Sequence, residues 1–139
     1  MKNIGVIGLG DMGSGIALNL IKNGFKVFGS DLLPARQQAF KNMGGSLEIS
    51  VADIGKKCDA VFVMVMNGSQ AKSIIFDEDG LARNMEAGST VILSATIKPS
   101  EAEEIGHLIK DTGLQFIDTP VSGGFPGAQS GTLTLMASA

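Results

Sequence analysis

Cysteine is almost missing from the sequence. Cys58 stands alone among 139 residues, so no internal disulfide bond can form. A lone thiol fits a reducing compartment, and we expect the protein in the cytoplasm. Long apolar runs are missing as well. The longest covers residues 60–66 and is far too short to cross a membrane, and the glycine-interrupted stretch 4–9 is too short for the apolar part of a signal peptide.

Positive charge is also scarce. The chain has 11 Lys and Arg against 14 Asp and Glu, which gives a formal net charge of -3. We therefore expect neither a nucleic acid nor a membrane surface as a partner, because both require clustered cations. The sequence shows no metal-ligand cluster, no Ser-His-Asp set and no pair of catalytic carboxylates. The single histidine, His107, is expected on a helix, exposed or half-buried, rather than as a base.

Glycine, by contrast, is abundant, with 19 of 139 residues, and it lies where predicted strands meet predicted helices. Residues 60–66 are apolar at every position, which is typical of a strand buried on both faces of a parallel sheet. The alternation predicts one α/β domain over residues 1–139, a Rossmann doubly wound, mainly parallel sheet with helices on both faces. Strands are predicted at residues 3–8, 26–30, 46–47, 59–66, 90–93, 115–118 and 133–136, and helices at 12–23, 33–43, 50–57, 69–76 and 100–110.

The strongest motif is Gly8-Leu9-Gly10-Asp11-Met12-Gly13, which follows a predicted strand and opens a predicted helix. This spacing is the dinucleotide-binding fingerprint. Gly8 would form the tight turn, Gly10 would let the pyrophosphate approach the backbone, and Gly13 would let helix and strand pack closely. The N–H groups at the start of the helix would then hold the pyrophosphate of a nicotinamide dinucleotide.

An acidic residue, Asp31, ends the second predicted strand, 23 residues after Gly8. Its carboxylate could accept hydrogen bonds from the adenosine ribose hydroxyls and would repel a 2′-phosphate, so NAD is expected over NADP. Two alternatives stay open. Asp31 could instead be a turn residue or a cap for the helix that follows Pro34, and Arg36 in the same loop could tolerate a 2′-phosphate.

Short polar side chains follow the later strands too, at Asn67, at Thr96, and in the stretch 118–124. In a doubly wound sheet the carboxyl ends of the strands form the ligand edge, so these segments are expected to converge on one site. Taken alone, Asn67-Gly68 is equally well explained as an ordinary turn.

Two motifs together resemble the β-hydroxyacid dehydrogenase family, which includes 3-hydroxyisobutyrate dehydrogenase, tartronate semialdehyde reductase and 6-phosphogluconate dehydrogenase. The first is the glycine motif extended from Ile7 to Leu20, with Ala17 and Asn19. The second is Asp118-Thr119-Pro120-Val121-Ser122-Gly123-Gly124, followed by Gly127-Ala128 and Gly131-Thr132-Leu133. The resemblance covers nearly the whole chain, and the second motif is the more specific one.

The resemblance implies a role for each matching residue. The adenosine half of the cofactor would be held by Gly8, Leu9, Gly10, Asp11, Met12, Gly13 and Asp31. Val65, Met66 and Asn67 would line the cofactor, and Thr96 would reach the nicotinamide ribose. The carboxylate of a small hydroxy-acid substrate would be bound by Ser122, Gly123 and Gly124.

The chain departs from the family pattern in two places. Met66-Asn67 stands where many members have Leu-Pro, a form that resembles the branch acting on four-carbon sugar acids such as L-threonate. The family's catalytic lysine and its all-helical substrate and dimerisation domain follow the cofactor domain, and no lysine here matches that motif. We therefore assign no catalytic residue in this chain. The intact enzyme is expected to form a homo-oligomer, and residues 1–139 alone are expected to bind NAD without oxidising hydroxy acids.

Two other functions stay open at this point. The chain could be a dinucleotide-binding sensor or regulatory module that performs no chemistry. It could also belong to an imine or semialdehyde reductase that uses NADPH, in which another residue replaces the lysine.

Overall fold

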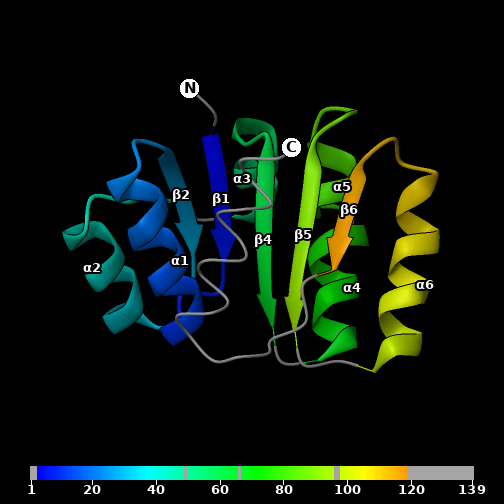
Figure 1. Ribbon diagram of the computed structural model, residues 1–139, viewed down its shortest axis with the longest axis horizontal. Coiled ribbons are helices and arrows are strands. Elements are labelled where there is room, and N and C mark those ends of the chain that lie inside the picture. Colours follow the sequence, from blue (N-terminus) through cyan, green and yellow to red (C-terminus); the bar gives the residue numbers. More distant parts are fainter. Residues whose placement is uncertain (1–2, 49, 66, 96–97, 119–139) are drawn as a thin grey trace.

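The computed structural model describes residues 3–48, 50–65, 67–95 and 98–118. Strands and helices alternate along these residues (Figure 1). The strands are β1 (Asn3–Ile7), β2 (Lys26–Ser30), β3 (Ser46–Leu47), β4 (Ala60–Val65), β5 (Thr90–Ala95) and β6 (Gln115–Asp118). The helices are α1 (Asp11–Lys22), α2 (Pro34–Asn42), α3 (Val51–Lys57), α4 (Gly68–Phe76), α5 (Leu81–Asn84) and α6 (Pro99–Lys110).

All six strands pair in parallel in one sheet, in the order β3-β2-β1-β4-β5-β6. The arrows in Figure 1 accordingly all point the same way. This is the strand order of dinucleotide-binding Rossmann folds, and it confirms the predicted doubly wound sheet. The chain moves outward in one direction from β1 to β3 and in the other direction from β4 to β6. The point where the order reverses therefore lies between β1 and β4.

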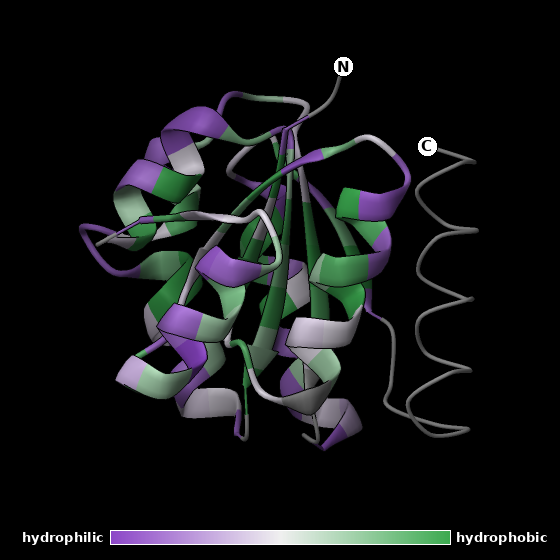
Figure 2. Cartoon of the chain, turned by 90° about the vertical axis from the view of Figure 1, so that its left-hand side faces the viewer, coloured by the Kyte–Doolittle hydropathy of each residue, from purple (hydrophilic) through white to green (hydrophobic). Residues whose placement is uncertain are grey.

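The sheet separates two hydrophobic cores, one on each face. Alternate residues of β4 show this directly, because Val61 and Val63 belong to one core while Ala60 and Phe62 belong to the other. Residues of α3, α4, α5 and α6 complete the first core, and residues of α1 and α2 complete the second. Figure 2, viewed from the side, shows apolar residues along the strands between these helices. Helices on both faces were predicted, and the structure confirms them.

Two local predictions were wrong. The sequence pattern Ser100-x-x-Glu103 after Pro99 predicts a capping box between Ser100 and Glu103, but α6 begins one residue earlier, at Pro99. Proline fits the first helical position because it has no N–H group to satisfy. As a result Glu101, not Glu103, accepts the hydrogen bond from the N–H group of the capping residue Lys98, at 3.1 Å. The other error is α5, a single turn of four residues that was not predicted.

The remaining differences are small or untested. Most element ends shift by a residue or two, as is usual for frayed ends. The predicted strand at residues 133–136 lies outside the described residues. Among the residues that are described, no helix is long and apolar enough to cross a membrane.

Candidate functional site

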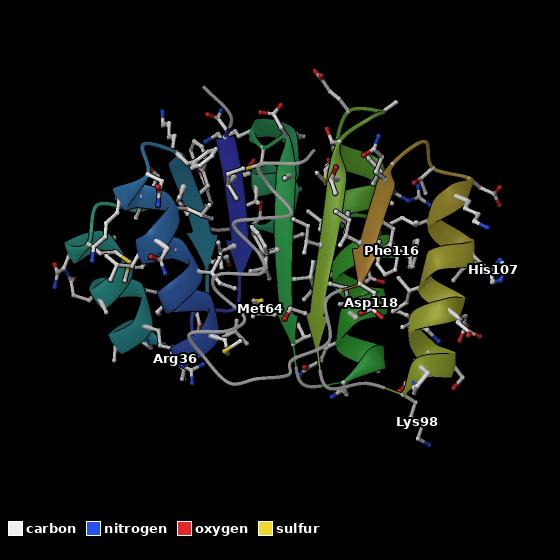
Figure 3. All side chains as sticks on the ribbon, in the orientation of Figure 1. Arg36, Met64, Lys98, His107, Phe116 and Asp118 are labelled. Carbon is white, nitrogen blue, oxygen red and sulfur yellow. The ribbon has the colours of Figure 1, made fainter. Side chains whose placement is uncertain are left out.

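A pocket of about 580 Å³ opens at the carboxyl ends of β1, β2 and β4. It straddles the point between β1 and β4 where the strand order reverses, which is where ligands bind in open α/β sheets. Arg36 and Met64, labelled in Figure 3, lie at this end of the sheet. The pocket is lined by Ile7, Gly8, Ser30, Asp31, Leu32, Leu33, Arg36, Val51, Met64, Val65, Ser69, Gln70, Ser73 and Ile74.

Two glycines of the motif are required by the fold itself. Gly8 has a φ of 95°, a conformation that residues with a side chain rarely adopt, and a Cβ there would collide with the carbonyl oxygen of Met64. A Cβ on Gly13 would collide with the carbonyl oxygen of Gly8. Because neither glycine carries a Cβ, the backbone can pack this closely and α1 can begin directly beyond the end of β1. Both roles were predicted from the spacing, and both are seen here.

Gly10 is different, because no contact among the described residues requires a glycine at this position. Its φ of -69° and ψ of -165° are ordinary for any residue. The nearest atoms that a Cβ would meet are the guanidinium atoms of Arg36, at 3.6 Å, which is a normal van der Waals distance. Among the described residues, the absence of a side chain at Gly10 therefore serves no close contact. It leaves the backbone open to a ligand.

The first turn of α1 supplies the donors for such a ligand. The N–H groups at the start of a helix have no partner within it, and the helix dipole adds partial positive charge. Gly10 is the residue before α1, and no side chain caps the helix at this position. Ser14 instead turns inward and donates from its hydroxyl to the carbonyl oxygen of Leu9, at 2.7 Å. Among the described residues, no side chain at the capping position occupies the start of α1, as an anion site requires.

Asp31 joins the end of β2 to the glycine loop. Its Oδ2 accepts the backbone N–H of Leu9 at 2.7 Å, and its Oδ1 accepts the backbone N–H of Leu33 at 2.9 Å. Its carbonyl oxygen accepts the side-chain amide of Gln37 at 2.7 Å. The turn role that was left open for Asp31 is therefore real, since the bond to Leu33 stabilises the chain just before α2. It does not exclude a role in binding, because the carboxylate also lines the pocket.

The surroundings of Asp31 keep it charged. Burial alone would raise its pKa, since only 5% of the side chain is exposed. The N–H groups of Leu33 and Leu9 and the charge of Arg36 outweigh this effect and hold the pKa of Asp31 below its ordinary value. At neutral pH the pocket therefore presents a fixed carboxylate, which can accept hydrogen bonds from hydroxyl groups and repels phosphate.

Arg36 on α2 lies beside that carboxylate. Its Nη1 is 3.5 Å from Oδ2 of Asp31, and its guanidinium group lies over Gly10. About half of the side chain, 48%, remains exposed. The pocket therefore carries one negative and one positive group next to the glycine loop, and Figure 3 shows Arg36 near the carboxyl ends of the strands.

The other predicted site residues that are described differ in what they offer. Leu9 is 1% exposed and its side chain belongs to the core, so only its backbone faces the loop. Val65 lines the pocket at the end of β4. Asn67 caps α4, with its side-chain oxygen accepting the N–H of Gln70 at 2.9 Å, so the alternative of a simple turn gives way to a helix cap. Met12 is half-buried in the first turn of α1.

Several predicted site residues lie outside the described part of the chain: Met66, Thr96, Ser122, Gly123 and Gly124. The side chain of Asp11 is not described either, although its backbone begins α1.

One wall of the pocket was missed in the sequence. Ser69, Gln70, Ser73 and Ile74 of α4 line it, and so do Leu32 and Leu33 beyond β2. Leu32 is 96% exposed, which is unusual for a leucine and offers an apolar surface next to Asp31. A signal for α4 existed in the sequence. Ser69 and Ser73 are four residues apart and so share one face of the helix, opposite the buried positions Ala71 and Ile75.

Other candidate groups in the chain are structural. Cys58 is buried in a core, and burial raises the pKa of its thiol to about 12, so it stays protonated and unreactive. His107 is exposed on α6, as Figure 3 shows. Within the described segments, no group of His, Cys, Asp and Glu side chains could hold a metal ion. The exposed position of His107 on α6 agrees with the prediction.

The fold and this pocket define a dinucleotide-binding Rossmann domain. Over residues 3–139 the chain matches the family model described as the NAD binding domain of 6-phosphogluconate dehydrogenase. The chain therefore belongs to this family, which confirms the predicted resemblance.

Relatives and solved structures agree with the family. The chain is 44% identical to the L-threonate dehydrogenase of Cupriavidus necator over 137 residues, which cover 99% of this chain and 46% of that protein. The 3-hydroxyisobutyrate dehydrogenase of Mycobacterium tuberculosis, solved with L-serine, matches with a TM-score of 0.85 and 28% identity over 94% of this chain and 44% of that one. Psf3, solved with NADP+ and 2-OPP, matches with a TM-score of 0.82 and 26% identity over 92% of this chain and 45% of that one. The chain thus spans about half the length of the proteins it matches.

The contrast between Gly10 and Gly13 can be tested with a matched pair of alanine variants. Gly13→Ala is expected to lower the free energy of unfolding by more than about 2 kcal/mol, because the new Cβ overlaps the Gly8 carbonyl oxygen. Gly10→Ala is expected to lower it by only about 0.5–1 kcal/mol, the usual difference between glycine and alanine at a helix N-cap. The same Gly10→Ala variant should bind NAD+ at least about tenfold more weakly. Urea denaturation and calorimetric titration measure the two effects, and Gly10→Ala being as destabilising as Gly13→Ala would contradict the assignment.

The lowered pKa of Asp31 predicts a pH-dependent part of the stability. Asp31 ionises at lower pH in the folded chain than in the unfolded chain, so its charged form stabilises the fold. This contribution is complete above the ordinary carboxyl pKa of about 4 and is lost as the pH falls through the lowered value. In urea denaturation, wild type should therefore exceed Asp31→Asn in stability by more at about pH 7 than at about pH 3. An equal difference at both pH values would show that the charge of Asp31 contributes nothing.

Proposed function

We propose that this chain is the cofactor domain of an NAD-dependent dehydrogenase that transfers hydride between a small 3-hydroxy acid or sugar acid and NAD. The observation that carries the proposal is the open backbone at Gly10, directly before the start of α1 and beside the Asp31 carboxylate. The family and the dehydrogenase relatives support it. When bound, NAD supplies the hydride acceptor for such chemistry.

The described residues fit the adenosine half of such a cofactor. Gly10 leaves room for the pyrophosphate, and the first N–H groups of α1 would hold it. Asp31 would accept hydrogen bonds from the hydroxyls of the adenosine ribose, because its carboxylate is charged and lines the pocket. The exposed Leu32 would offer an apolar surface to the base. The fixed charge of Asp31 favours NAD over NADP.

The rest of the reaction is proposed from the family resemblance. Val65, Met66, Asn67 and Thr96 would continue the cofactor site, and Ser122, Gly123 and Gly124 would bind the substrate carboxylate. The similarity to the L-threonate dehydrogenase of C. necator favours a four-carbon sugar acid as the substrate class. The catalytic lysine, the helical substrate domain and the contacts of a homo-oligomer would lie in sequence beyond these 139 residues. We place the protein in the cytoplasm, because Cys58 is buried and unpaired in a disulfide, which fits a reducing compartment.

The cofactor preference is tested by titrating this chain with NAD+ and NADP+ in a calorimeter. NAD+ is expected to bind more tightly, by at least about tenfold, because a 2′-phosphate would lie against the charged Asp31. Asp31→Ala should lose most of the affinity for NAD+. The matched control is Asp111→Ala, which removes an exposed carboxylate at the end of α6, far from the pocket, and should change nothing. Tighter binding of NADP+ by wild type would overturn the preference.

A second measurement tests where the catalytic group lies. The purified 139-residue chain is expected to produce no steady NADH from NAD+ with either 3-hydroxyisobutyrate or L-threonate, because no described side chain near the pocket can serve as a general base for the substrate hydroxyl other than the engaged Asp31. Sustained NADH production that follows the chain through purification would place the catalytic group within these residues.

A further inference from the structure

A single carboxylate lies between the first turns of α4 and α6. Glu101 belongs to the first turn of α6, and its Oε1 accepts the backbone N–H of Lys98, the residue before that helix, at 3.1 Å. Its other oxygen faces Gly68, the first residue of α4, where a Cβ would overlap Oε2. One side chain therefore contacts the starts of two helices that are far apart in the sequence.

The glycine at position 68 is explained by this carboxylate. The backbone there does not require a glycine, because Gly68 has no positive φ. The three nearest atoms that a Cβ on Gly68 would meet all belong to the side chain of Glu101. Because Gly68 has no side chain, the carboxylate can lie directly against the start of α4. The partial positive charge of a helix start suits a carboxylate at this place.

A second pair of charged groups joins the same two helices further from their starts. Nζ of Lys72 on α4 lies 2.8 Å from Oε2 of Glu104 on α6. These side chains are 37% and 55% exposed, and such surface pairs contribute little. Glu101, by contrast, is half-buried and lies at the ends of the helices that adjoin the strand ends. Figure 1 shows both helices beginning at the edge where β4 and β5 finish.

The start of α4 belongs to the candidate site. Ser69 and Gln70 in its first turn line the pocket, and Asn67 caps it. In the proposed function, Asn67 and Thr96 would continue the cofactor site toward the nicotinamide ribose. These two residues belong to the connections that follow β4 and β5, which are neighbours in the sheet. The contact of Glu101 with Gly68 therefore fixes the side of the pocket that adjoins the nicotinamide half.

We propose that Glu101 is a positioning residue for the nicotinamide half of the cofactor. It touches no part of the ligand and holds the first turn of α4 at a fixed separation from the first turn of α6. This inference rests on the proposed function and deepens it, because it assigns the order of one half of the site to one side chain. Without Glu101 the adenosine half would still meet α1 and Asp31, whereas binding of the nicotinamide half would have to order its own site.

The test compares NAD+ with ADP, which lacks the nicotinamide ribose half. In calorimetric titrations of this chain, Glu101→Ala is expected to weaken binding of NAD+ by at least about fivefold and binding of ADP by less than about twofold. Glu101→Gln keeps the length of the side chain and one oxygen for the N–H of Lys98, so it should stay within about twofold of wild type for both ligands. A general loss of stability would weaken both ligands alike.

A second variant displaces the carboxylate without removing it. In Gly68→Ala the new Cβ overlaps Oε2 of Glu101, the flexible end of that side chain, which must swing away. We expect this variant to lower the ratio of NAD+ to ADP affinity as Glu101→Ala does, and the double variant to lower it no further. In thermal melting, Gly68→Ala should lower the melting temperature by at least about 2 °C in wild type and by nothing in the Glu101→Ala background.

Glu104→Ala is the matched control, because it removes an exposed carboxylate from the same helix and breaks the pair with Lys72. It should leave the ratio of affinities unchanged. Three results would overturn the proposal: equal weakening of NAD+ and ADP by Glu101→Ala, an equally changed ratio in Glu104→Ala, or additive effects of Gly68→Ala and Glu101→Ala on the ratio. Should Glu101→Ala fail to fold, Gly68→Ala alone must still lower the ratio, and an unchanged ratio would count against the role.

The proposed function and this inference fail in distinguishable ways. If wild type binds neither NAD+ nor ADP, the proposed function is wrong and the positioning role is wrong with it, whatever the melting temperatures show. If wild type binds both and no variant at Glu101 or Gly68 changes their ratio, the proposed function stands and the inference alone is wrong.

Discussion

One close contact underlies the whole site: the backbone of α1 at Gly13 rests on the carbonyl oxygen of Gly8, with no space for a Cβ between them. Because of this contact, α1 starts directly beyond the end of β1. Its unpaired N–H groups therefore face the same edge at which β2 and β4 end. A larger residue would push the helix outward and carry its positive end away from that edge. The packing of the sheet and the geometry of the proposed anion site thus have the same origin.

Asp31 serves the fold, and in the proposed function its carboxylate would serve a ligand as well. A carboxylate offers about four acceptor positions, and here the N–H groups of Leu9 and Leu33 and the guanidinium of Arg36 approach it. A ribose that presents both of its hydroxyls needs two of these positions. We therefore expect Arg36 to move aside when such a ligand binds, which costs little because the pair is exposed on the arginine side. The backbone bonds meanwhile keep the carboxylate charged and in place.

The sequence was sufficient for the fold because its signals repeat. Strand β4 is apolar at every position, and the spacing of Gly8, Gly10 and Gly13 is typical of the dinucleotide-binding fingerprint. The sequence was insufficient to predict α5, because a single turn leaves too short a signal. It was also insufficient to place the start of α6, because Pro99 and Ser100 are both plausible first residues of the helix. The α4 wall of the pocket was missed for another reason. Apolar periodicity marks the helix face that packs on the core, and it carries no information about what the opposite face meets.

The glycine motif shows the same limit, and the structure goes further than the pattern here. The spacing assigns each of the three glycines a role, but a chain with this much glycine can match such a motif by chance. In the structure Gly8 and Gly13 are explained by contacts within the chain, whereas Gly10 is not. Gly10, which no contact among the described residues requires to be a glycine, lies beneath the guanidinium of Arg36, at the start of a helix that has no side-chain cap at Gly10. These features have separate physical origins, and the anionic cofactor of the proposed function accounts for all of them.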